Sequence, residues 1–307
     1  NTFTDMFVAV SDEVKEELIK GGLAKDSEFG ISWIHLGHAT SAEIEALANL
    51  VAPTDMMDVK FTDPNDTSYK KIGLDGSPNW VKLATNSKLP ADKLKQAAAF
   101  LETHRYAALQ GASMAFTKME GTTVNVRDKV AYSALAYIKD SMVKGGKGWH
   151  EDNGIALDKA VNAGGVMALN LKRGQKDHSG KPINSEWVAA DTKALIVGED
   201  LATRDALGNT AHADKIGNPD NIKFSEKLRT LFIGEDSGMH VNNFVWAYNI
   251  DTKELSRIMS VPAGAEATGL FVADNINGYT YIMSNFQHAG DWEKLHSVVQ
   301  PTLDPII

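Results

Sequence analysis

Apolar residues follow two different periods along this chain. Up to about residue 110 they recur every three or four positions, as on one face of a helix. Ser11–Gly22 and Ser41–Leu47 each begin with a capping serine and acidic residues, and Pro90–Leu109 has the same apolar spacing. Residues 55–90 are rich in Pro, Gly, Asn and Asp, which indicates an irregular surface stretch with short strands. We therefore predict a helical and irregular region over residues 1–110.

From residue 111 to residue 307, short strands separated by turns replace the helical spacing. The expected strands are Lys129–Ile138, Gly165–Leu171, Trp187–Val197, Thr230–Gly234, Phe244–Ile250, Leu255–Ser260, Gly269–Ala273 and Tyr279–Asn285. Turn sequences such as Asn275-Ile276-Asn277-Gly278 join several of them. Strands this short and closely spaced favour a sandwich, a barrel or a propeller over a doubly wound sheet, so the fold class is mainly β.

One short sequence occurs twice within this β region. An apolar run ends in Gly198-Glu199-Asp200, and another ends in Gly234-Glu235-Asp236, 36 residues later (234 − 198). One four-stranded propeller blade takes about 40 residues, so the spacing favours β-propeller blades. Acidic turns at strand ends bring carboxylates to one rim, which makes Glu235 and Asp236 candidate metal ligands. The alternative is two buried strands followed by ordinary polar turns.

The length of the β region limits the number of blades. Residues 111–307 suffice for about four or five blades of about 40 residues each. The propeller within this chain is therefore expected to be incomplete. An upstream fragment of the same polypeptide is the partner expected to complete it.

Composition narrows the partners and the chemistry. The chain has 40 acidic and 31 basic residues, and the resulting net charge of −9 disfavours nucleic acid and anionic membranes as partners. It has no cysteine, which excludes disulfides, thiolate metal ligands and a cysteine nucleophile within the chain. No apolar stretch approaches the ~20 residues of a membrane span. Gly145-Gly146-Lys147-Gly148 lacks the framing residues of a Walker phosphate loop and is expected to be a turn.

Two segments combine side chains that suit a metal and a phosphate. Lys118 and Glu120 lie close together where a strand begins, so the carboxylate suits a metal ion and the ammonium suits a phosphate oxygen. Asp220 and Asn221 offer two adjacent oxygen ligands, a set that suits calcium better than zinc. Both segments are also good generic turns, and the alternative is that they are solvated polar loops.

Two further candidates lie near the carboxyl end. Glu266 is the one carboxylate in the loop Pro262–Gly269, whose small residues allow a backbone to approach a ligand closely. His288 follows an expected strand and precedes Asp291. We interpret His288 as a residue that orients a ligand side chain, rather than as a metal ligand itself.

Together, these segments resemble the PhoX-like family of calcium-dependent bacterial alkaline phosphatases. The residues that carry the resemblance are Ala98–Gly111, Lys118–Gly121, Asn218–Asp236, Gly264–Gly269 and Gln287–Asp291, in the family's order. The resemblance implies a six-bladed β-propeller with calcium and iron (Fe3+) ions on its axis. It also implies hydrolysis of a small phosphate ester substrate, in the periplasm or outside the cell.

By this resemblance, Glu120 and Asp220 correspond to metal ligands of the family, and Glu266 and His288 are assigned to the same site. Lys118 replaces an arginine that contacts phosphate, and it lacks the bidentate fork of arginine. The family's Cys-Glu-Glu segment, which contributes to the iron centre, has no counterpart here. Clustered cations would neutralise the phosphate and orient it for in-line attack.

Two other functions are compatible with the same residues. The first is a non-catalytic calcium-binding propeller that serves as a cell-surface or interaction module, which the missing Cys-Glu-Glu segment and Lys118 both favour. The second is a phosphotriesterase or lactonase propeller with calcium at a similar axial site. An assay with lactones or phosphotriesters separates this last function from the others.

Overall fold

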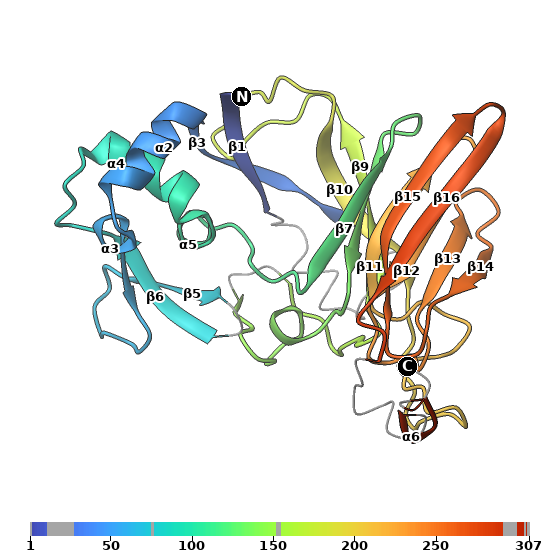
Figure 1. Ribbon diagram of the computed structural model, residues 1–307. Helices are drawn as coiled ribbons and strands as arrows, with labels where there is room; N and C mark the ends of the chain where they lie inside the picture. Colours follow the sequence, from blue (N-terminus) through green and yellow to red (C-terminus); the bar gives the residue numbers. More distant parts are fainter. Residues whose placement is uncertain are drawn as a thin grey trace.

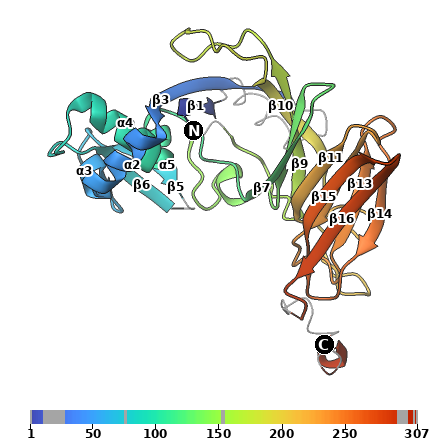
Figure 2. The same cartoon turned by 45° about the horizontal axis from the view of Figure 1, so that its top comes forward.

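The computed structural model describes residues 2–10, 28–74, 77–151, 155–290, 300–303 and 305. Over these residues the protein is mainly β and contains several antiparallel sheets. A lobe that carries most of the helices lies at one end of the molecule, and the larger sheets lie at the other end (Figures 1 and 2). The helix expected over Ser11–Gly22 lies outside the described residues.

The N-terminal lobe combines helices with a small sheet. Its elements are β3 (Ser32–Thr40), α2 (Ser41–Leu50), α3 (Pro53–Met56), β4 (Met57–Lys60), β5 (Lys70–Leu74), β6 (Ser77–Leu83), α4 (Ala91–Leu101) and α5 (Thr103–Leu109). The strands β4, β6 and β5 form an antiparallel sheet, and β1 (Thr2–Val10) pairs with β3. Leu47, Val81, Leu94 and Tyr106 are buried in one shared core. β4, β5 and β6 are the short strands expected within residues 55–90, whereas β3 lies outside that stretch and was not predicted.

Two helix boundaries differ from the predicted ones. The N-cap of α2 is Thr40 rather than Ser41, and Thr40 and Glu43 form a reciprocal capping box. The single helix expected over Pro90–Leu109 is two helices, separated at Glu102. The Thr103 hydroxyl donates a 2.7 Å hydrogen bond to the Ala99 carbonyl, and such back-bonding bends helices.

The β region consists of two antiparallel meanders followed by a hairpin. The first meander is β7 (Met119–Asn125), β8 (Val130–Leu135), β9 (Gly165–Lys172) and β10 (Val188–Val197), and the second is β11 (Pro219–Ser225), β12 (Thr230–Glu235), β13 (Phe244–Asn249) and β14 (Leu255–Ser260). The hairpin is β15 (Glu266–Ile276) and β16 (Tyr279–Gln287), and β2 (Glu28–Gly30) pairs with the outer edge of β10. A short 3-10 helix (Asp140–Met142) and α6 (Gln300–Leu303) complete the described elements.

All eight strands that we predicted are present; β14 has the predicted bounds, Leu255–Ser260, and the other seven differ at one or both ends. Two further strands, β7 and β11, were predicted only as places where a strand begins, because polar residues surround their first residues: Lys118 and Glu120 at β7, and Asn218 and Asp220 at β11. Each is the first strand of its meander, and each adjoins the next: β7 lies beside β11, and β11 lies beside β15 (Figure 1). Within the described residues, no barrel or propeller closes.

Hydrophobic packing holds the two meanders face to face. Buried side chains from both sheets form one cluster, which includes Tyr132, Val166, Phe224, Ile233 and Trp246. The rings of Tyr132 and Phe224 lie 5.6 Å apart. Tyr132 lies on β8 and Phe224 on β11, so this contact holds the two sheets together. β7 pairs with β8 and lies beside β11, which brings the starting residues of β7 and β11 close together.

Gly121 allows β7 to approach β11 closely. A Cβ atom at Gly121 would lie 2.4 Å from the Asp220 carbonyl oxygen and 2.8 Å from the Ile222 backbone nitrogen. Gly121→Ala is therefore expected to lower the free energy of unfolding by about 1–3 kcal/mol, because backbone atoms must move apart. Urea denaturation measures this loss, and Thr122→Ala at the exposed neighbouring position is the control. Equal stability of the two variants would contradict the close packing.

The Gly-Glu-Asp repeat has a different meaning from the predicted one. Gly198-Glu199-Asp200 follows β10, the fourth strand of its meander, whereas Gly234-Glu235-Asp236 spans the end of β12, the second strand of the next. The two segments therefore occupy non-equivalent places, and the 36-residue spacing (234 − 198) is not the repeat of the sheets. The interpretation as a blade repeat was wrong, since similar strand ends recur in any antiparallel meander.

Equivalent positions of the two meanders are 100 residues apart in the sequence (218 − 118). Lys118 and Asn218 each precede the first strand of a meander, with φ of 47° and 46°. Lys129 and Arg229 each lie in the first hairpin turn, with φ of 55° and 53°. The start of each meander and its first turn are therefore built alike, although the side chains differ.

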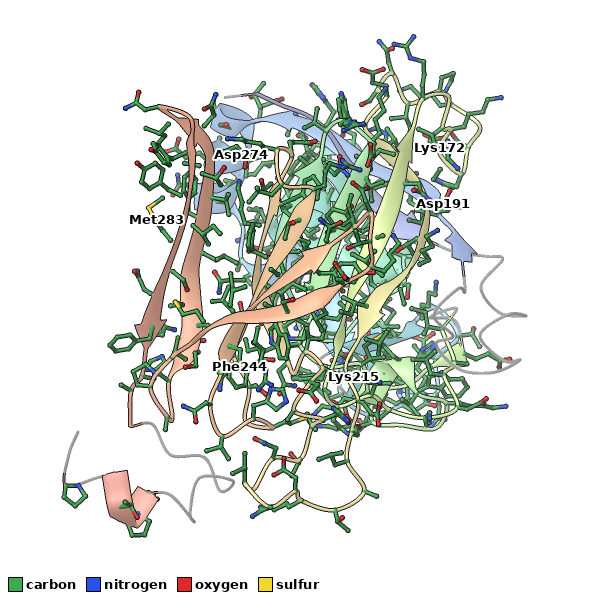
Figure 3. All side chains as sticks on the ribbon, turned by 90° about the vertical axis from the view of Figure 1, so that its right-hand side faces the viewer. Lys172, Asp191, Lys215, Phe244, Asp274 and Met283 are labelled. Carbon is green, nitrogen blue, oxygen red and sulfur yellow. The ribbon has the colours of Figure 1, made fainter. Side chains whose placement is uncertain are left out.

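The side chains of the β15–β16 hairpin are much more exposed to solvent than those of the inner strands of the meanders. Tyr281, Ile282 and Met283 are 47%, 42% and 47% exposed. Consecutive residues of a strand point to opposite faces, so both faces of β16 are open to solvent. Figure 3 shows Met283 projecting away from the rest of the protein. In contrast, every residue of β12, the second strand of its own meander, is buried.

Candidate functional site

Three carboxylates lie where three adjacent strands begin. Glu120 is the second residue of β7, Asp220 is the second residue of β11, and Glu266 is the first residue of β15. These three strands are the first strands of the two meanders and of the hairpin. Because neighbouring first strands lie side by side, their starting residues are brought to one end of the sheets.

Asp236 reaches the same place from a different strand. It directly follows β12, which runs antiparallel to β11, so that Glu235 at the end of β12 pairs with Pro219 at the start of β11. The Asp236 backbone nitrogen donates a 3.2 Å hydrogen bond to the Asn218 carbonyl oxygen. This turn places the Asp236 side chain beside Asp220.

The side chains of Asp220, Asp236 and Glu266 converge. One carboxylate oxygen from each lies within 4.8 Å of those from the other two. Asp236 is exposed and Asp220 is partly buried, while the Glu266 side chain is 11% exposed. We refer to these three residues together with Glu120 as the carboxylate cluster. Such a group of oxygens, with one side open to solvent, suits a hard divalent cation.

The negative charges of the carboxylate cluster repel one another. Burial raises the pKa of Asp220, as do the nearby charges of Glu120 and Asp236, while Lys118 opposes the shift. Burial also raises the pKa of Glu266, together with the charges of Asp236 and Asp220, and His288 opposes this shift. A bound cation would remove the repulsion that contributes to both shifts.

Lys118 supplies the positive charge at the edge of the carboxylate cluster. Its ammonium forms a short ion pair with Glu120, which raises the pKa of Lys118. The side chain is 41% exposed, so the ammonium is accessible to a ligand from solvent. The structure thus brings Lys118 and Glu120 together as the sequence suggested.

Asn221 and His288 border the carboxylate cluster. The Asn221 amide donates to Asp220 Oδ1 at 3.2 Å and to Thr268 Oγ1 at 3.4 Å, so its nitrogen links β11 to β15. His288 Nε2 lies 3.8 Å from Glu266 Oε1 on a side chain that is 63% exposed. His288 is therefore near enough to interact with the charge of Glu266, and its role in orienting that side chain stays a prediction.

Glu235 lies apart from the carboxylate cluster in a buried network. It is fully buried, and its Oε1 accepts 2.7 Å hydrogen bonds from the Gly217 backbone nitrogen and from Trp246 Nε1. Its Oε2 accepts from the Phe244 backbone nitrogen at 3.0 Å, and His240 Nδ1 lies 3.1 Å from both oxygens. These contacts occupy both oxygens of Glu235, so its role as a metal ligand is not supported.

Asp200, the counterpart of Asp236 in the sequence repeat, also has a structural role. Its carboxylate accepts hydrogen bonds from the backbone nitrogens of Asn162 and Ala163 at 2.9 and 2.8 Å. It therefore fixes a loop near the start of β9. Of the two Gly-Glu-Asp segments, only the second contributes to the carboxylate cluster, and it does so through Asp236 alone.

A cavity beside Lys118 contains residues that the sequence did not link to the site. It has a volume of about 740 Å³, and its lining includes Lys118, His104, Tyr137 and Lys147. Lys147 belongs to the glycine-rich turn Gly145–Gly148, His104 lies within Ala98–Gly111, one of the segments that carry the PhoX-like resemblance, and Tyr137 lies in the expected strand Lys129–Ile138. None of the three was predicted as a site residue. Only their positions in space connect them.

We compared the chain with known families, proteins and structures. No family model, curated protein or solved structure matches it. None of the described helices combines the length and the apolar character needed to cross a bilayer.

Proposed function

We propose that the carboxylate cluster binds a calcium ion. The observation that carries this proposal is the convergence of Asp220, Asp236 and Glu266 within 4.8 Å. All of these donors are oxygens, which calcium prefers, and calcium accepts the irregular geometry of ligands from separate strands. Fe3+ is not part of this proposal, because the chain has no counterpart of the cysteine-containing segment that the PhoX-like resemblance would require.

We further propose that the calcium site hydrolyses phosphate monoesters, as the resemblance to PhoX-like phosphatases suggests. The bound cation would neutralise the phosphoryl oxygens and orient the group for attack. Lys118, at the edge of the carboxylate cluster, would bind a further phosphoryl oxygen once the cation engages Glu120. The resemblance also places this reaction in the periplasm or outside the cell.

The arrangement of the sheets supports a propeller. We propose that the two meanders are consecutive blades and that the β15–β16 hairpin begins a third blade. In this arrangement β7, β11 and β15 are the strands nearest the axis, and the carboxylate cluster lies at one end of it. The third blade needs further strands beyond β16, and we propose that another segment of the same polypeptide supplies them. The open faces of β16 support this arrangement.

Calcium titration and a phosphatase assay test the proposed function together. Calcium at about 100 times its Kd is expected to stabilise the protein by about 2.7 kcal/mol. Differential scanning fluorimetry measures this effect as a rise in Tm, with magnesium as the matched control ion. Turnover of an aryl phosphate at alkaline pH is expected only with calcium present. A Tm that is insensitive to calcium would contradict the binding site.

A non-catalytic calcium-binding module is the second candidate. The observation that favours it is the ion pair between Lys118 and Glu120, because a lysine that stays paired is less available to a phosphate. In this case calcium raises the Tm, but no phosphate ester is hydrolysed. The same two measurements therefore separate the two candidates.

A further inference from the structure

The cavity beside the carboxylate cluster is large enough for a small organic ligand. Its volume is about 740 Å³, within the range of ligand pockets. Lys118 and Met119 line it, and Lys118 also pairs with Glu120, so the Lys118 side chain contacts both the cavity and the carboxylate cluster. A ligand whose phosphoryl group reaches the carboxylate cluster would extend into this cavity.

The cavity contains polar groups that lack a protein partner. Among the described residues, Lys147 forms no ion pair, and neither the His104 ring nor the Tyr137 hydroxyl has a hydrogen-bond partner. Lys147 lies in a turn in which Gly145 and Gly148 have φ of 74° and 71°. These three side chains therefore remain available to a ligand.

The charge of the cavity favours an anion. Lys118 and Lys147 are the lysines of the lining, and Asp140 is its one carboxylate. Lys118 is paired with Glu120, whereas Lys147 keeps its charge without an ion pair among the described residues. Near the cavity, the Lys139 ammonium lies 4.1 Å from the centre of the Tyr137 ring and adds a further positive charge. Excess positive charge is unusual in a protein whose net charge is −9. An anionic group is the ligand that this lining would attract.

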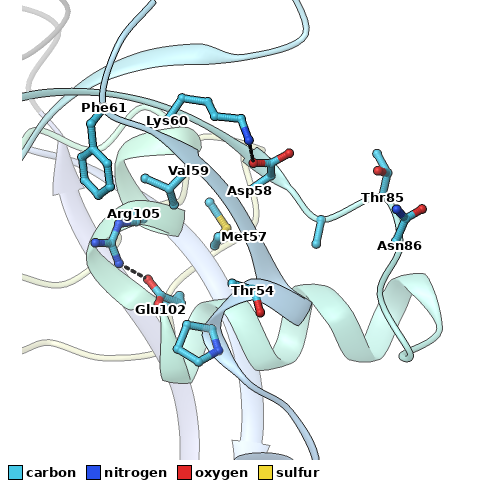
Figure 4. A pocket seen from close by; sticks show the side chains of 12 residues that line it. Thr54, Met57, Asp58, Val59, Lys60, Phe61, Thr85, Asn86, Glu102 and Arg105 are labelled. Atoms are coloured by element: carbon cyan, nitrogen blue, oxygen red, sulfur yellow. Dashed lines mark hydrogen bonds and ion pairs between the residues drawn. The ribbon is translucent and has the colours of Figure 1, made fainter. Parts of the chain in front are cut away.

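A second cavity provides a comparison. It lies in the N-terminal lobe, has a volume of about 450 Å³, and is shown in Figure 4. There, Lys60 pairs with Asp58 at 2.9 Å, and Arg105 pairs with Glu102 at 2.6 Å. Both of its cations are neutralised by neighbouring carboxylates. Of these two cavities, the one beside Lys118 combines a lysine without an ion pair, Lys147, with a side chain that contacts the carboxylate cluster.

The remaining lining is partly apolar. Phe116 and Met119 are 37% and 58% exposed, and Met114 is a third apolar residue in the lining. Aromatic and thioether side chains favour flat, apolar ligand groups. The ligand is therefore expected to have an aromatic or apolar body between two anionic ends.

We propose that the cavity binds the alcohol part of the substrate, and that the substrate is a phosphate monoester of an aromatic or apolar alcohol that also carries a carboxylate. The phosphoryl group lies at the carboxylate cluster and Lys118, while the carboxylate lies at Lys147 and His104. The inference rests on the proposed function, because it places the phosphoryl group beside the bound cation.

A pair of non-hydrolysable ligands tests the inference without turnover. Benzylphosphonate and 4-carboxybenzylphosphonate differ only in the carboxylate, and isothermal titration calorimetry with calcium present gives their Kd values for the full chain. The carboxylated ligand is expected to bind about fivefold to tenfold more tightly, because its carboxylate gains a charge-assisted contact. Lys147→Met should remove this advantage. Lys144→Met, at an exposed lysine outside the lining, should preserve it.

Asp140 provides a second variant with the opposite effect. Its φ is 52°, a conformation that asparagine also tolerates, so Asp140→Asn should preserve the fold. Removal of this negative charge should tighten the binding of 4-carboxybenzylphosphonate about twofold to fivefold. Weaker binding by Asp140→Asn would overturn the inference, because it would show that Asp140 stabilises the bound ligand instead of repelling its carboxylate.

The outcomes separate this inference from the proposed function. The inference would be overturned if the two phosphonates had equal Kd values, or if Lys147→Met still bound the carboxylated phosphonate more tightly. Either result would overturn it even if the protein hydrolyses aryl phosphates. If Lys147→Met loses the tighter binding of the carboxylated phosphonate but no phosphate ester is hydrolysed, the cavity binds the ligand's carboxylate and the phosphatase proposal fails.

Discussion

Replacement of Asp220 by asparagine is expected to abolish the calcium-dependent rise in Tm without destabilising the calcium-free protein. Asp220 is partly buried near Glu120 and Asp236, and its pKa is raised by burial and by their charges. Asparagine keeps the shape of the side chain but removes a charge that repels its neighbours. The calcium-free variant should therefore be at least as stable as the unmodified protein.

The same substitution is expected to weaken calcium binding strongly. The number of charged ligands controls calcium affinity, so the Kd should rise by about 30-fold or more. Isothermal titration calorimetry measures this change, and turnover of an aryl phosphate should fall by about 10²-fold to 10³-fold. Asp214→Asn is the matched control, since this exposed aspartate pairs with Arg257 away from the carboxylate cluster. If Asp220→Asn binds calcium normally, Asp220 is not a ligand.

Glu235→Ala is expected to have the largest effect on stability, with a loss of about 3–5 kcal/mol in the free energy of unfolding. The substitution leaves the buried donors of Gly217, Phe244, Trp246 and His240 without their acceptor. Each buried donor that loses its partner carries a desolvation cost. Urea denaturation monitored by tryptophan fluorescence measures the loss directly, because Trp246 is one of these donors.

Asp236→Ala is the control for Glu235→Ala at the adjacent residue. Asp236 is exposed, and its side chain belongs to the carboxylate cluster. Its loss should weaken calcium binding while the calcium-free stability changes little. A well-folded Glu235→Ala variant that fails to bind calcium would reverse the roles assigned to these two residues.

This pair of residues also shows what the sequence could not resolve. Glu235 and Asp236 are adjacent carboxylates after the same apolar run, and both were candidate ligands. Their roles differ because successive residues point in opposite directions, which places one in the core and the other at the rim. The direction depends on how β12 pairs with β11 and β13, and the local sequence does not contain that information.

The strands themselves were easier to predict than their order. Apolar runs identified β8, β9, β10, β12 and β13, because a buried strand needs apolar side chains on both faces. Nothing in these runs indicated which strand comes first in a sheet. The Gly-Glu-Asp repeat was misinterpreted for this reason, since similar ends occur on a second strand and on a fourth strand.

The candidate site was predicted residue by residue but not as an assembly. Glu120, Asp220 and Glu266 each stood out in a polar loop, although 100 residues (220 − 120) separate the first two and 46 residues (266 − 220) separate the last two. Their convergence depends on the side-by-side packing of three strands. His104 and Tyr137 were not predicted, because neither stands beside another candidate ligand in the sequence, and only the folded chain brings them to the cavity.

The open hairpin has a consequence for the colloidal behaviour of the protein. β16 carries no charged residue, and uncharged edge strands tend to pair with other strands. The net charge of −9 keeps copies of the chain apart at long range, but at 0.15 M ionic strength this repulsion extends only about 8 Å. Added salt therefore favours association of protein molecules through their β16 strands. Dilute protein in low salt is expected to stay uniform in size.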